Sequence, residues 1–109
     1  DTAVRLISKP SPTGSARPAA DELAAILTED GFEVRRPDAG HPDAPAVVAR
    51  LSSGRPGRVL QFNGHLDTVH LPFAAAKVSG DRLTGSGSAD MKAGIAATVE
   101  AMRAVRDAG

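Results

Sequence analysis

Hydrophobic positions recur with helical spacing in two stretches of this 109-residue chain. Each stretch has one apolar face, made by Ala19, Leu23, Ile26 and Leu27 in the first and by Ile95, Val99, Met102 and Val105 in the second. The first helix is predicted to start at a Ser15 cap, to carry Pro18 in its first turn and to end at Gly31. The second spans residues 92–107. Residues 1–7 also read as helix, entered partway.

Shorter runs rich in β-branched and apolar residues lie between these helices. Residues 32–36, 46–51 and 59–63 read as strands, the last two joined by a turn containing Gly and Pro. Adjacent apolar residues at 59 and 60 are typical of a strand covered on both faces. Residues 77–84, with Gly80 and Asp81 at their centre, predict a small hairpin. This order predicts an α/β fold, a layered sheet with flanking helices.

Composition limits the chain to one domain with a small core. Hydrophobic residues make up 41% of the sequence but only three residues are aromatic, so Ala, Val, Leu and Ile must fill the core. Zero net charge and the lack of a basic run argue against a nucleic-acid or membrane partner. No signal pattern or apolar run of ~20 residues is found, which predicts a soluble chain, and the lack of cysteine is typical of a cytoplasmic protein. Without cysteine, histidines and carboxylates are the plausible metal ligands.

Candidate ligands follow the predicted strand 59–63 directly. Gly64 permits a sharp exit, so that His65 and Asp67 leave the sheet at its carboxyl edge, where open α/β sheets bind their ligands. One residue apart in an extended segment, the two side chains project to the same side, and Asp67 can hold the imidazole in one tautomer. By itself this triplet is more typical of a histidine that is hydrogen-bonded within a turn.

Asp90 stands where the glycine-rich residues 85–88 turn into the last predicted helix. A carboxylate at this position can cap the helix or reach a metal ion bound at the sheet edge. The other two histidines are interpreted without a ligand role: His41 as a solvated loop residue, and His70 as a rim or packing residue. Lys92 is interpreted as facing solvent or forming an ion pair.

Two motifs, residues 64–69 (GHLDTV) and 85–92 (GSGSADMK), resemble the metal-binding segments of the zinc-dependent aminoacylase and carboxypeptidase family. This family includes acetylornithine deacetylase, succinyl-diaminopimelate desuccinylase and glutamate carboxypeptidase. Residues 11–14 (SPTG) and 31–34 (GFEV) are similar to its opening helix and first strand. Because complete members are several times longer, the resemblance implies that residues 1–109 are the N-terminal part of a catalytic domain. The rest of that domain and any dimerisation domain would be absent.

The resemblance implies a hydrolase that cleaves the amide bond of N-acyl amino acids or peptides. It implies two Zn²⁺ ions per complete site, with Co²⁺ as an alternative metal. His65 would bind one ion, Asp90 would bridge both, and Asp67 would orient His65. The family's Glu-Glu pair, which supplies the general base and a ligand, falls after Gly109, so the isolated chain is expected to be inactive. Any oligomer would belong to the full-length protein.

Two other functions remain open at this stage. One is a non-catalytic, truncated module; a Glu-Glu pair in the sequence after Gly109 would exclude it. The other is a phosphate or nucleotide binder that uses Gly85 to Ser88 at a helix N-terminus, although the Asp90 carboxylate would repel a phosphate.

Members of the resembling family carry a cis peptide bond at the position of Asp90 and Met91. Because the downstream ligands lie outside this chain, we expect this bond to be trans here, or residues 85–91 to be poorly ordered.

Overall fold

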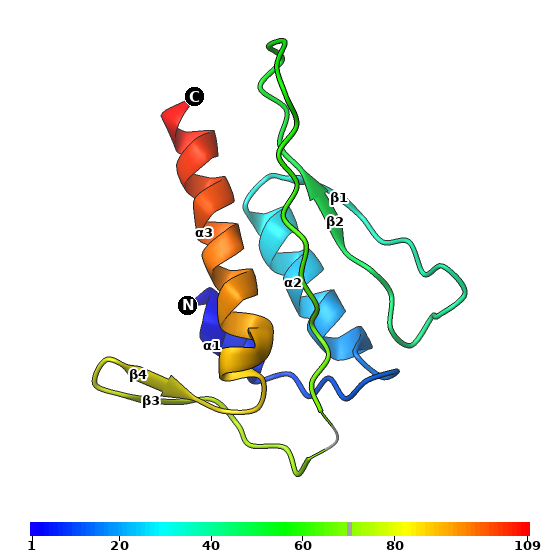
Figure 1. The fold of residues 1–109 in the computed structure, drawn as a ribbon, viewed down its shortest axis with the longest axis vertical. Coiled ribbons are helices and arrows are strands. Elements are labelled where there is room, and N and C mark those ends of the chain that lie inside the picture. Colours follow the sequence, from blue (N-terminus) through cyan, green and yellow to red (C-terminus); the bar gives the residue numbers. More distant parts are fainter. Residues whose placement is uncertain (70) are drawn as a thin grey trace.

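The computed structural model describes residues 1–69 and 71–109, so His70 lies outside the described residues. The described chain forms three α-helices and two small antiparallel strand pairs (Figure 1). The helices are α1 (Thr2–Ile7), α2 (Arg17–Glu29) and α3 (Ala93–Ala108). Strand β1 (Glu33–Arg35) pairs with β2 (Val48–Arg50), and β3 (Lys77–Ser79) pairs with β4 (Arg82–Thr84). This mixture of helices and strands confirms the α/β class.

The helices follow the predicted apolar stripes, with one difference at the start of α2. Pro18 lies in the first turn of α2 as expected, but the N-cap is Ala16, which forms no side-chain cap hydrogen bond. The predicted cap at Ser15 is therefore wrong. Ser15 instead closes a tight turn before the helix, because its backbone N–H donates to the Pro12 carbonyl over 2.8 Å. Gly31 follows α2 with a φ of 80°, a conformation that favours glycine.

The hydrophobic core lies where the three helices and β1 meet. Its buried members are Leu6, Leu23, Ile26, Leu27, Phe32 and Val99. Ile95 and Met102 of α3 are partly buried against this cluster. Val105, which the periodicity placed on the same face, is 63% exposed, because the core reaches only as far as Met102 along α3. None of the helices in the described part of the chain is long and apolar enough to cross a bilayer.

The third predicted strand, residues 59–63, is not formed. This segment runs past α2 and α3 as an extended chain (Figure 1), and no other described segment pairs with it. Val59 is 84% exposed and Leu60 is 78% exposed, so the expected cover on both faces is also missing. The predicted pairing of residues 46–51 with 59–63 is wrong: β2 pairs with β1.

A parallel β-bridge joins the loop after α1 to the segment that follows His65. Pro12 and Thr68 form an isolated parallel β-bridge, and the Thr68 N–H donates to the Ser11 carbonyl over 2.8 Å. The Ser11 hydroxyl, which is 1% exposed, donates to the Leu66 carbonyl over 2.8 Å. The segment after α1 is therefore held in register with the segment that carries His65 and Asp67.

Candidate metal site

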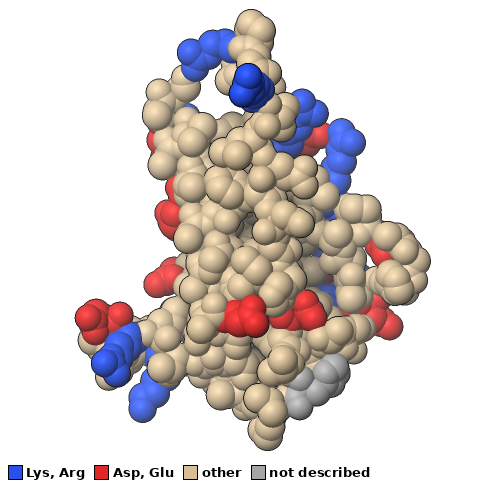
Figure 2. Space-filling view, viewed as in Figure 1, with Lys and Arg blue, Asp and Glu red and all other residues tan. Residues whose placement is uncertain are grey.

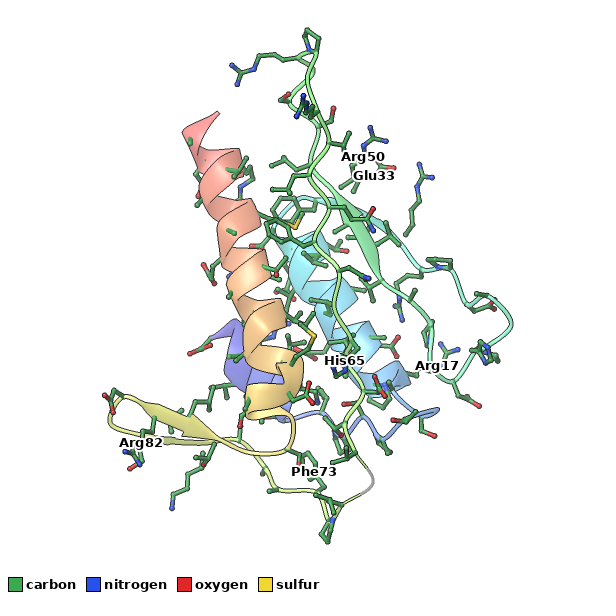
Figure 3. The ribbon with its side chains drawn as sticks, viewed as in Figure 1. Arg17, Glu33, Arg50, His65, Phe73 and Arg82 are labelled. Carbon is green, nitrogen blue, oxygen red and sulfur yellow. The ribbon has the colours of Figure 1, made fainter. Side chains whose placement is uncertain are left out.

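His65 lies on the extended segment where it passes the N-terminal end of α3 (Figure 3). This close approach depends on Gly64, because a Cβ atom there would lie 2.7 Å from Ile95 Cδ1 and 3.0 Å from Met91 Cε. The His65 backbone N–H also points to Met91 Sδ at 3.4 Å. The glycine before the histidine thus brings the imidazole next to the turn that carries Asp90.

The two nitrogens of the His65 ring face different partners. Nε2 lies 3.0 Å from Asp90 Oδ1. Nδ1 lies 3.0 Å from the Asp67 carbonyl oxygen and 3.2 Å from Asp67 Oδ1. The three side chains that sequence analysis singled out are therefore brought together, with the imidazole between the two carboxylates.

The site is open to solvent and acidic. His65, Asp67 and Asp90 line a hollow of about 300 Å³ together with Thr13 and Thr68. The Asp90 side chain is 83% exposed and the His65 side chain 48%. Figure 2 shows acidic side chains at the centre of the face on which Figure 3 labels His65. Such a surface favours a cation over an anion.

The donor atoms fit part of a zinc centre. Histidine nitrogen and carboxylate oxygen bind zinc at about 2.0–2.2 Å, so two ligands of one tetrahedral ion lie about 3.4 Å apart. The 3.0 Å separation of His65 Nε2 and Asp90 Oδ1 is close to this value. Asp67 lies on the other side of the ring, where a carboxylate orients a metal-binding histidine. Among residues 1–69 and 71–109, no three His, Cys, Asp or Glu residues are grouped to hold an ion.

Asp90 lies in a wide turn, Ser88–Lys92, that leads into α3. It does not cap the helix, because the N-cap position belongs to Lys92. The Asp90–Met91 peptide bond is cis and residues 85–91 are all placed, so the expectation of a trans bond or poor order is wrong. Backbone hydrogen bonds within the chain stabilise this turn. The Ser88 N–H donates to the Gly85 carbonyl, and the Lys92 N–H donates to the Gly87 carbonyl.

Lys92 differs from its predicted role at the surface. Its side chain is fully buried, and Nζ donates to the Lys9 carbonyl over 2.7 Å. Burial lowers the pKa of this ammonium group. The lysine therefore connects the turn before α3 to the segment just after α1, a contact between residues 83 positions apart. His41, in contrast, is exposed in its loop, as predicted.

Hydrogen bonds shift the pKa values of the central pair in opposite directions. The contact between His65 Nδ1 and the Asp67 carbonyl raises the pKa of His65, and the Asp90 carboxylate adds to this effect. The pKa of Asp67 is lowered, chiefly because the Thr13 hydroxyl donates to Oδ2 over 2.5 Å. Thr13 was not singled out from the sequence. The signal lay in the SPTG segment, which was interpreted only as the approach to a helix.

The raised pKa gives a testable pH dependence. In the metal-free chain we expect His65 to titrate above the ordinary value of about 6.5 in an NMR titration, with His65→Gln assigning the resonance. Its stabilising contribution should be fully present below pH 6.5 and should be lost as pH rises through the folded pKa. Asp90→Asn should lower this pKa. A His65 pKa at or below 6.5 would contradict the described contacts.

Comparison with known proteins identifies one family and a group of similar enzymes. Residues 61–109 match the family described as peptidase family M20/M25/M40. The chain is also 40% identical, over 98% of its length, to a succinyl-diaminopimelate desuccinylase of Methylobacterium radiotolerans. The chain is a relative of the M20 peptidases. The matched region contains His65, Asp67 and Asp90, and the family resemblance drawn from the sequence is confirmed.

Further relatives have the same name and a similar level of identity. The desuccinylase of Methylorubrum populi is 41% identical over 88% of this chain, and that of Gluconobacter oxydans is 44% identical over 73%. The chain spans 30%, 27% and 23% of the length of these three relatives. No solved structure matches the chain.

Proposed function

We propose that residues 1–109 are part of the catalytic domain of a metal-dependent amidohydrolase, with His65 and Asp90 as metal ligands. The observation that carries this proposal is the 3.0 Å contact between His65 Nε2 and Asp90 Oδ1 at an open, acidic hollow. The contact joins the two motifs by which the chain resembles the M20 peptidases.

The metal would be Zn²⁺, with Co²⁺ as an alternative, and the complete site would hold two ions. Bound divalent ions polarise a substrate carbonyl and make a bound water more acidic. In this chain His65 offers Nε2, and Asp67 fixes the ring by accepting at Nδ1. The Asp90 carboxylate is exposed, so that its two oxygens are available to two ions.

The substrate would be an N-acyl amino acid or a peptide. The relatives' name, succinyl-diaminopimelate desuccinylase, supports an N-succinyl amino acid as the first compound to test. We further propose that the general base and the remaining ligands belong to a longer protein, which would act in the cytoplasm and in which any oligomer contacts would lie. The non-catalytic module remains the alternative. The phosphate binder is disfavoured, because the exposed Asp90 carboxylate lines the hollow beside residues 85–88.

Hydrolysis by a full-length protein that carries this chain tests the proposal. The protein should release free amine from N-succinyl or N-acetyl amino acids or from dipeptides. A chelator should abolish this activity, and Zn²⁺ or Co²⁺ should restore it. Hydrolysis that survives complete metal removal, or no hydrolysis of any compound by the metal-loaded protein, would contradict the proposal.

A further inference from the structure

A chain of polar contacts connects the loop after α1 to the candidate metal ligand. The Thr13 hydroxyl donates to Asp67 Oδ2 over 2.5 Å, and Asp67 Oδ1 lies 3.2 Å from His65 Nδ1. The two carboxylate oxygens of Asp67 are therefore divided between two partners. In the described part of the chain the Thr13 hydroxyl forms its hydrogen bond with Asp67 and none with His65 or Asp90, so its effect on the imidazole is expected to pass through Asp67.

The backbone around Thr13 is fixed independently of this hydroxyl. The buried Ser11 side chain donates to the Leu66 carbonyl, and the Thr68 N–H donates back to the Ser11 carbonyl. These bonds hold residues 11–13 in register with residues 66–68. Thr13 itself is exposed, so its side chain contributes little to the core. Loss of its hydroxyl should therefore leave the loop in position while freeing the Asp67 carboxylate.

The Asp67 carboxylate needs such a partner to keep its orientation. The last torsion of an aspartate has broad, shallow minima, and a solvent-accessible carboxylate can turn to bind water instead. The Asp67 side chain is 36% exposed, and Thr13 lines the same hollow. With Oδ2 held by Thr13, Oδ1 stays on the side of Nδ1, where it adds a charged acceptor to the Asp67 carbonyl oxygen that lies 3.0 Å from Nδ1. Together the two acceptors favour the Nδ1–H tautomer, which leaves the Nε2 lone pair of the neutral ring for a metal ion.

We propose that Thr13 is a positioning residue of the metal site, which orients the Asp67 carboxylate so that, together with the Asp67 carbonyl, it favours the His65 tautomer that binds metal through Nε2. This proposal rests on the proposed function for its metal readout. The tautomer readout is independent of that function, because it is measured on the metal-free chain.

The experiment compares Thr13→Val, which removes only the hydroxyl donor, with Thr13→Ser, which keeps it. Thr98→Val is the matched control, because the Thr98 hydroxyl donates to the Gly94 carbonyl within α3. Zn²⁺ affinity is measured by competition titration on the full-length protein. The His65 tautomer is read from imidazole ¹⁵N shifts of the metal-free 109-residue chain at alkaline pH. Circular dichroism checks that each variant is folded.

We expect Thr13→Val to weaken Zn²⁺ binding about 10-fold and to shift the neutral His65 ring from the Nδ1–H toward the Nε2–H tautomer. Thr13→Ser should restore both properties, and Thr98→Val should change neither. A Thr13→Val variant with wild-type affinity and wild-type ¹⁵N shifts would overturn the proposal. If the wild-type protein binds no Zn²⁺, the proposed function fails, and the tautomer shift alone decides the role of Thr13.

Discussion

His65→Ala and Asp90→Ala should each lower the kcat/KM of a full-length protein that carries this chain by roughly 1000-fold or more. The reason is that a divalent ion contributes several kcal/mol of transition-state stabilisation, and about 1.4 kcal/mol corresponds to a tenfold change in rate. Each substitution removes one of the two donors that face each other at 3.0 Å. The metal content of the purified protein should fall together with the rate.

Two further substitutions separate metal binding from orientation. Asp67→Ala should reduce the rate by only ~10–100-fold with less metal lost, because this carboxylate acts behind the imidazole rather than on the ion. His41→Ala is the matched control, since this histidine is exposed in a distant loop. If His41→Ala or His70→Ala were as damaging as His65→Ala, the ligand assignment would be wrong.

The second large effect is the complete absence of turnover by the 109-residue chain alone, even with added Zn²⁺ or Co²⁺. Catalytic zinc takes three protein ligands plus a water molecule, and hydrolysis needs a base positioned to deprotonate that water. The described residues provide His65 and Asp90 at the hollow but no third grouped ligand. Asp67 is occupied by Thr13 and His65, so it is not a free base.

The assay for this prediction uses the panel of N-succinyl and N-acetyl amino acids and dipeptides proposed for the full-length protein. Release of amine is followed with the chain at the highest concentration that stays in solution. The full-length protein serves as the positive control. Turnover that follows the purified 109-residue chain through chromatography and disappears with a chelator would show that these residues suffice for catalysis.

Local patterns in the sequence predicted the elements that local contacts stabilise. The period of apolar residues predicted α2 and α3, and the Gly80-Asp81 pair predicted the hairpin of β3 and β4. Residues 59–63 have the composition of a covered strand, but pairing depends on a neighbour that residue spacing does not specify. The N-cap of α2 is Ala16, one residue later than predicted, because Ser15 instead closes a turn with Pro12.

The site was predictable to the extent that its residues have distinctive chemistry. A histidine and two carboxylates in recognisable motifs indicated that residues 65, 67 and 90 would meet, and their side chains do meet. The residues that hold the site in place were not predictable in this way. Thr13 and Lys92 contact residues 54 and 83 positions away, and a threonine or a lysine has many ordinary roles at a surface. Only the folded chain shows what each one holds.

The most direct test of the His65 and Asp90 assignment is to locate the metal by anomalous diffraction at the zinc edge from crystals of the full-length protein grown with Zn²⁺. We expect an anomalous peak about 2.0–2.2 Å from both His65 Nε2 and an Asp90 carboxylate oxygen, with Asp67 still against Nδ1. A peak bound by other residues while His65 and Asp90 remain in contact with each other would contradict it. So would the absence of any peak at a Zn²⁺ concentration that supports activity.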